Sequence, residues 1–79
     1  MSSEPRIHQS AYKHGIARED ILHAYRNYTR VHRLDDETVA LFGSDQSNNI
    51  LEIILVISNQ EDVIIHAMRI RKKFWSIYA

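Results

Sequence analysis

The chain has 79 residues and no cysteine, and its ten basic and ten acidic side chains cancel. A chain of this length predicts one small domain, which buries only about 60% of the surface of its unfolded form. The lack of cysteine excludes disulfides, thiolate nucleophiles and zinc-thiolate sites. No apolar run approaches the roughly 20 residues that span a membrane, and the N-terminus has no signal-peptide pattern, so we expect a soluble cytoplasmic protein.

The neutral total hides an uneven distribution of charge along the chain. Residues 34–65 contain seven acidic side chains and no Lys or Arg. Shortly after His66, four cations occur within five residues: Arg69, Arg71, Lys72 and Lys73. Cations clustered beside a histidine indicate local contact with a polyanion.

The first predicted elements are helical. Residues 1–9 read as a polar lead-in, and residues 10–14 favour one helical turn that ends at Gly15, a residue suited to a helix C-cap. Residues 17–28 form the best predicted helix. Their apolar side chains follow the i, i+3, i+4, i+7 spacing of one buried face, and two acidic residues occupy the first turn.

Three or four strands follow, at residues 29–34, 38–42, 50–57 and 63–70, and a short helix or tail closes the chain at 71–78. Residues 43–49 form a long turn of residues that tolerate a positive φ. The strand at 50–57 is apolar on both faces except at Glu52, which is typical of a central strand. Short loops favour an antiparallel sheet of three to four strands with the N-terminal helices packed on it, an α+β domain over residues 10–79.

Four short pieces of sequence occur in order between residues 6 and 75. They are Tyr12-Lys13-His14-Gly15-Ile16; Asp20-Ile21-Leu22-His23-Ala24 with Arg26-Asn27; Gly43-x-Asp45 with Leu51-Glu52-Ile53; and Ile64-Ile65-His66-Ala67-Met68 with Arg71-x-Lys73-Phe74. Together they resemble the BrnT-type branch of the RelE/ParE toxin superfamily. The resemblance implies a RelE/BrnT-like sheet with a basic cleft.

The same resemblance implies a type II toxin that acts as an endoribonuclease on mRNA, on the ribosome in some cases, and is silenced by a cognate antitoxin. A homodimer and a toxin–antitoxin hetero-oligomer both stay open as assemblies. BrnT-like sequences carry Ala and then Arg at the end of the last strand, whereas here Met68 follows Ala67. The missing cation keeps an alternative open, a catalytically weak relative that acts as a protein- or nucleic-acid-binding module.

His66 is the candidate for acid–base chemistry. Cleavage of RNA by its own 2′-hydroxyl needs a base, an acid and cations that neutralise the phosphate, and imidazole titrates near neutrality. Arg69 and Arg71 would supply the cations, so no metal or cofactor is predicted. The competing interpretation is that His66 is structural and packs beside Ile64 and Met68 on one strand face.

Further cations are predicted to bind RNA phosphate: Lys72, Lys73, Arg30, Arg33 and Lys13. The competing interpretation is a solvated basic end. Strand alternation places Arg30 and Arg33 on opposite faces, so at most one of them joins a given cleft. His14 is a second acid–base candidate, although we read its Lys-His-Gly element mainly as a fold signature.

The aromatic tail also has two interpretations. Phe74, Trp75 and Tyr78 could stack on unpaired bases. Alternatively, Phe74 and Tyr78 have the spacing of one helix face and pack on the core, which leaves Trp75 free for a partner.

Overall fold

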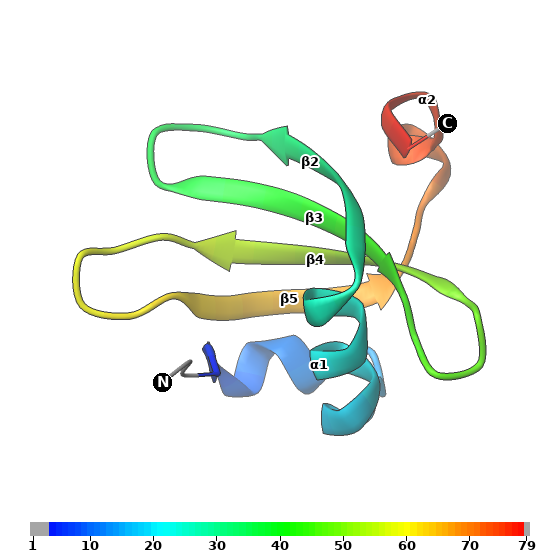
Figure 1. Cartoon of the computed structure of the whole chain (residues 1–79), viewed down its shortest axis with the longest axis horizontal. Coiled ribbons are helices and arrows are strands. Elements are labelled where there is room, and N and C mark those ends of the chain that lie inside the picture. The colour runs from blue at the N-terminus through cyan, green and yellow to red at the C-terminus, as the bar shows by residue number, and fades with distance from the viewer. Residues whose placement is uncertain (1–3, 79) are drawn as a thin grey trace.

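The computed structural model describes residues 4–78 as a five-stranded sheet with helical segments around it (Figure 1). The elements are β1 (Arg6–Ile7), the 3₁₀ helix η1 (Gln9–Tyr12), α1 (Arg18–Arg26), β2 (Tyr28–Arg33), β3 (Thr38–Ser44), β4 (Ile50–Val56), β5 (Val63–Arg69), the 3₁₀ helix η2 (Lys72–Phe74) and α2 (Trp75–Tyr78). The strand order is β1-β5-β4-β3-β2, with antiparallel pairing from β2 to β5. The predicted α+β class is confirmed.

The prediction of three or four antiparallel strands is wrong, because part of the expected polar lead-in joins the sheet. Arg6 and Ile7 pair in parallel with Val63 and Ile64, and the His8 amide donates to the Ile64 carbonyl at 2.9 Å. A strand of two residues is too short to carry a periodic hydrophobic pattern. The added strand makes β5 an interior strand of a mixed sheet.

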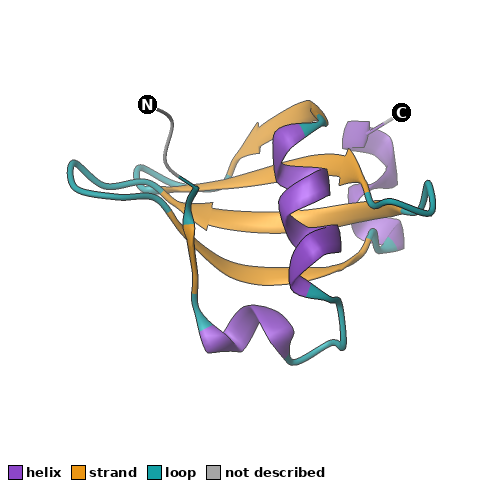
Figure 2. Ribbon diagram, turned by 60° about the horizontal axis from the view of Figure 1, so that its bottom comes forward, coloured by secondary structure: helices purple, strands orange, loops and turns teal. Residues whose placement is uncertain are grey.

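The helix α1 covers one face of the sheet (Figure 2). Ile21 and Ala24 are fully buried there, and burial of a side chain such as Ile21 contributes about 1.5–3 kcal/mol. The helix is shorter than the predicted range of 17–28, because Ala17 is its N-cap and β2 already begins at Tyr28. The core on this face comprises Ala11, Ile21, Ala24, Val39, Leu41, Leu51, Ile53, Leu55, Ile64 and Ala67.

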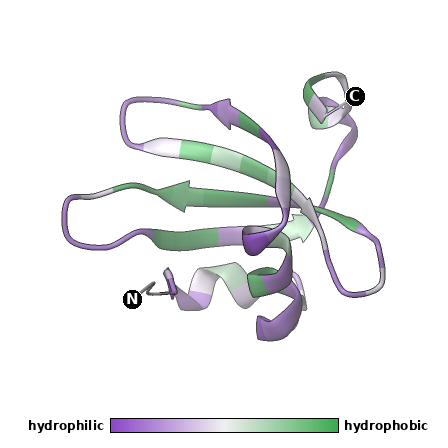
Figure 3. Ribbon diagram, viewed as in Figure 1, coloured by the Kyte–Doolittle hydropathy of each residue, from purple (hydrophilic) through white to green (hydrophobic). Residues whose placement is uncertain are grey.

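The opposite face carries a smaller core beneath the C-terminal segment. Phe42 and Phe74 have ring centroids 5.3 Å apart, and Tyr78 packs on the same cluster. The prediction that Phe74 and Tyr78 pack on the core is therefore confirmed, while Trp75 stays 46% exposed. Figure 3 shows that β4 is mostly hydrophobic, as expected for a central strand between two cores, and Glu52 is its one charged residue.

The predicted turn at 43–49 is shorter in the structure, because Gly43 and Ser44 belong to β3. Gly43 is needed for a close approach rather than for a positive φ, since a Cβ atom there would lie 2.3 Å from the Ala24 carbonyl oxygen. The positive φ falls on Asn48 instead, at 71°. The last turn of α1 therefore rests directly on the backbone of β3.

Candidate functional site

The pairing register assembles polar side chains on the sheet face opposite α1. Directly paired residues of neighbouring strands point to the same face. One row across the sheet joins Arg30, Phe42, Glu52 and Met68. The adjacent row joins His32, Ala40, Ile54 and His66. Glu52 and His66 are thus diagonal neighbours on β4 and β5, outside the core beneath α1.

Glu52 is a fully buried carboxylate at the centre of this face. Its Oε1 accepts the backbone N–H of Arg71 at 2.8 Å. Its Oε2 accepts Arg71 Nε at 2.8 Å, lies 2.6 Å from Arg71 Nη2 and lies 2.9 Å from His66 Nε2. A buried carboxylate is stable only with such compensation, so Glu52 joins His66 and Arg71 in one unit, the Glu52 cluster.

Hydrogen bonding keeps this carboxylate ionised. Burial raises the pKa of Glu52, but hydrogen bonds from Arg71 and His66 outweigh burial and hold that pKa below its usual value. The contact with Glu52 raises the pKa of Arg71 in turn. An ionised carboxylate only accepts hydrogen bonds, so we assign the Nε2 proton of His66 to this contact. The Nδ1 atom of neutral His66 is then free to accept a proton.

A β-bulge turns His66 toward Glu52. Ile54 pairs with His66 and Leu55 with Ile64, so Ile65 is the extra residue of β5. Ile64 is consequently buried in the core beneath α1. The expectation that His66 packs beside Ile64 on one strand face is therefore wrong, whereas Met68 does share the face of His66.

The bulge also brings the N-terminal segment to His66. The Ser10 hydroxyl donates to the Ile65 carbonyl at 2.7 Å, which holds η1 against β5. Just beyond η1, the His14 ring lies edge-on to the His66 ring, with centroids 5.3 Å apart and planes at 72°. The side chain of His66 is 19% exposed, and His14 is exposed. The two imidazoles form the open side of the Glu52 cluster.

Arg71 is held in place but remains accessible. Its side chain is 40% exposed, and its guanidinium carbon lies 5.7 Å from the centroid of the Phe74 ring. The guanidinium donors that do not face Glu52 are available to an anion. Lys73 lies over the same ring at 5.1 Å, and Lys72 is exposed in the same turn.

The structure does not bring all the predicted site residues together. Arg69 pairs with Leu51, a residue of the core beneath α1, so Arg69 points away from His66. Its charge acts on Asp45. Burial raises the pKa of Asp45, but hydrogen bonds from Asn49 and Ser47 outweigh burial, and Arg69 lowers that pKa further.

The remaining predicted cations are exposed and divided between the two faces. Arg30 pairs with Phe42 and shares the face of Glu52, whereas Arg33 pairs with Val39 on the face of α1. The predicted separation of the two arginines is confirmed. Lys13 is exposed beside His14.

The sequence pattern does not single out Glu52 as a site residue. In the sequence Glu52 only interrupts an apolar strand and belongs to one of the pieces that carry the family resemblance. The available signal was its isolation, because a lone acidic residue in an otherwise apolar central strand is rarely buried without a partner. The sequence could not show that the partners are His66 and Arg71.

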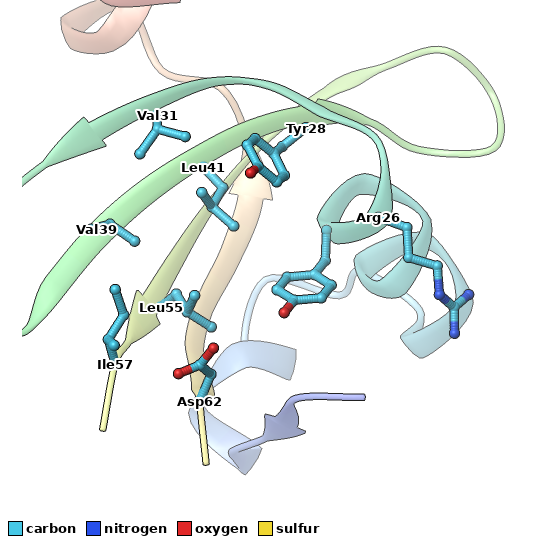
Figure 4. Close-up of a pocket in the computed structure, with 9 residues that line it drawn as sticks. Arg26, Tyr28, Val31, Val39, Leu41, Leu55, Ile57 and Asp62 are labelled. Carbon is cyan, nitrogen blue, oxygen red and sulfur yellow. The ribbon is translucent and has the colours of Figure 1, made fainter. Parts of the chain in front are cut away.

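A concave surface lies on the face of α1 (Figure 4). It is an apolar groove of about 450 Å³ between the helix and the open edge of the sheet at β2, lined chiefly by Tyr25, Tyr28, Val31, Val39, Leu41 and Leu55. Its charged lining residues are Arg26 and Asp62. Burial and the nearby Asp62 raise the pKa of Tyr25. The residues that line the groove include no histidine beside a buried carboxylate, so the candidate acid–base groups lie on the opposite face.

Within residues 4–78 no three His, Asp or Glu side chains gather as ligands for a metal ion. No helix in this part of the chain has the length and apolar character needed to cross a membrane. Comparisons with protein-family models, curated proteins and solved structures found no match to this chain.

Proposed function

We propose that the protein is a metal-independent endoribonuclease of the RelE/BrnT kind, a type II toxin that cleaves mRNA in the cytoplasm and is neutralised by a cognate antitoxin. The observation that supports this proposal is the Glu52 cluster. It combines an oriented histidine, an accessible arginine and a buried carboxylate on one sheet face. The histidine can serve as the base and the arginine can neutralise the phosphate, which are two of the functions that cleavage by the 2′-hydroxyl of RNA requires.

Each group has a defined role in the proposed reaction. His66 accepts the proton of the 2′-hydroxyl at Nδ1, and Glu52 stabilises the resulting imidazolium through Nε2. Arg71 binds the non-bridging oxygens of the phosphate, whose charge grows in the transition state. Lys72, Lys73 and Lys13 bind neighbouring phosphates.

A second candidate function is RNA binding without cleavage. Met68 supports it, because this apolar residue pairs directly with Glu52 at the position where a cation would add to the phosphate site. Arg69 does not replace that cation, since it points to the other face. A binding module would keep affinity for RNA and leave the RNA intact.

Expression in a bacterial host tests the toxin proposal. Induction of the protein alone should arrest growth and reduce incorporation of labelled amino acids into protein. His66→Ala and Arg71→Ala should each relieve the arrest. Because loss of either partner of the buried Glu52 also destabilises the domain, circular dichroism must show that the variant compared with wild type is folded.

Arg69→Ala is the matched control, because it removes a nearby arginine from the opposite face and should leave the arrest intact. Normal growth of cells that contain soluble wild-type protein would contradict the toxin proposal. RNA affinity without cleavage would then favour the binding module.

A further inference from the structure

We propose that His14 is a second proton-transfer residue of the Glu52 cluster and protonates the leaving 5′-oxygen while His66 deprotonates the 2′-hydroxyl. This inference rests on the proposed ribonuclease function and adds a role that the function alone does not assign. It is carried by the contact between the two imidazoles, 5.3 Å from centroid to centroid.

The fold holds His14 at this position from both sides. On the N-terminal side, η1 is fixed to the bulge of β5 by the bond from Ser10 Oγ to the Ile65 carbonyl, at 2.7 Å. The His8 ring caps η1 by accepting the Ser10 amide at 3.1 Å. On the C-terminal side, Gly15 has a φ of 79° and turns the chain away directly after His14. An exposed histidine beside the partly exposed His66 and its buried partner Glu52 has the placement of a substrate-contacting residue.

The charges around the two rings differ, and this difference assigns the roles. His66 contacts the ionised Glu52 of β4, which stabilises the imidazolium that forms when His66 accepts a proton. His14 instead follows Lys13 in the chain and is exposed, and within residues 4–78 its ring makes no hydrogen bond to a carboxylate, while β5 presents the uncharged Met68 on the face of His66. The contact with Glu52 stabilises the charge that His66 gains when it acts as a base, and the exposed ring of His14 is placed to meet the leaving group, so we assign the acid role to His14 and the base role to His66.

The step balances in atoms and charge. The 2′-hydroxyl proton moves to Nδ1 of His66 as the 2′-oxygen forms a bond to phosphorus. The bond from phosphorus to the 5′-oxygen breaks, and that oxygen takes a proton from the His14 imidazolium. The products are a 2′,3′-cyclic phosphate and a 5′-hydroxyl, and exchange with water restores both imidazoles.

Two substrates separate the roles. A uridine 3′-(4-nitrophenyl phosphate) carries a leaving group that departs without protonation. The leaving group of a uridine-containing dinucleotide is a 5′-oxygen, which needs a proton to depart. His14→Ala should lower cleavage of the dinucleotide by about 10²-fold or more, the range of general acid catalysis, and change the activated substrate by less than about threefold. His66→Ala should impair both reactions.

His32→Ala is the matched control. His32 lies on the same face at the far end of the row of His66, three strand spacings or roughly 14 Å away, and its loss should change neither rate. The role of His14 is wrong if His14→Ala leaves dinucleotide cleavage unchanged or reduces both reactions equally. Failure of the wild-type protein to cleave either substrate, alone or with ribosomes, would instead overturn the ribonuclease proposal.

A measurement without turnover gives a second test. In a titration with uridine 3′-monophosphate followed by NMR, the imidazole resonances of both His14 and His66 should shift with one common dissociation constant, while those of His32 stay in place. A response of His66 without His14 would contradict the proposed pair.

Discussion

Replacing Glu52 by Gln tests whether the Glu52 cluster is the electrostatic centre of the sheet face opposite α1. The substitution keeps the shape of the side chain and removes its charge. Four nitrogen atoms lie within hydrogen-bond distance of the carboxylate, three of them from Arg71 and one from His66. An amide turns one NH₂ group toward these donors, so at least one donor loses its acceptor and the remaining bonds lose their charge assistance.

The expected loss can be estimated from these contacts. Removing one partner of a buried ion pair costs about 3–5 kcal/mol. The side chain of Arg71 is 40% exposed and regains water, so we expect about 2–3 kcal/mol for Glu52→Gln. In a domain of this size that loss lowers the Tm by about 10–20 °C.

The assay is urea unfolding followed by far-ultraviolet circular dichroism and by Trp75 fluorescence. Trp75 lies in α2, beyond Arg71, whose backbone N–H binds Glu52, so its signal also reports release of the C-terminal segment.

The pKa of Glu52 is depressed in the folded protein. The stabilisation that the Glu52 carboxylate contributes is therefore present above the unfolded pKa of about 4.3 and is lost as the pH falls through the folded value. The gap between wild type and variant should therefore shrink in acid. A variant within about 0.5 kcal/mol of wild type at pH 7 would refute this reasoning.

Three further predictions follow from the structure. Gly43→Ala places a Cβ atom 2.3 Å from the Ala24 carbonyl oxygen and should lower the free energy of unfolding by about 1–3 kcal/mol. Gly15→Ala meets no atom and should lower it by about 1–2 kcal/mol through its φ of 79° alone. Equal stability of Gly43→Ala and wild type in urea unfolding would contradict the close packing of α1 on β3. Asp45→Asn should destabilise the folded protein by about 1–2 kcal/mol at pH 7 and by less in acid, because the depressed pKa of Asp45 makes its contribution largest above the unfolded pKa of about 3.9. A difference in Tm between variant and wild type that does not depend on pH would contradict this prediction. Changing Lys72 and Lys73 together to Gln should reduce the slope of log RNA affinity against log salt concentration by about 1–1.5, because each phosphate contact on a single strand contributes about 0.7 to that slope. The slope can be measured by fluorescence anisotropy, and an unchanged slope would mean that both lysines are solvated and do not contact RNA.

The helix could be predicted from its apolar periodicity, and the four antiparallel strands from β-branched or apolar runs bounded by turn residues. Three of these strands end within a residue of their predicted bounds, and β3 extends two residues beyond its prediction. β1 could not be found, because a pair of residues carries no period and its partner in β5 lies more than fifty residues away.

The faces on which the candidate site residues lie escaped prediction for a different reason. The faces of His66 and Ile64 depend on the bulge at Ile65, and strict alternation assigns them to the same face. Arg69 and Arg71 look equivalent in the sequence, but the first still lies in β5 and the second lies beyond it, where it folds back onto Glu52. Clustering of charge in a sequence thus identified the region, and the end of a strand decided which residue faces His66.

The most direct test of the proposed function is the chemistry of the RNA ends. Purified protein should be incubated with a long single-stranded RNA in EDTA, with and without ribosomes. We expect wild type to form fragments that end in a 2′,3′-cyclic phosphate and begin with a 5′-hydroxyl, and we expect a folded His66→Ala variant to form none. Intact RNA under both conditions, or cleavage that EDTA abolishes, would contradict it.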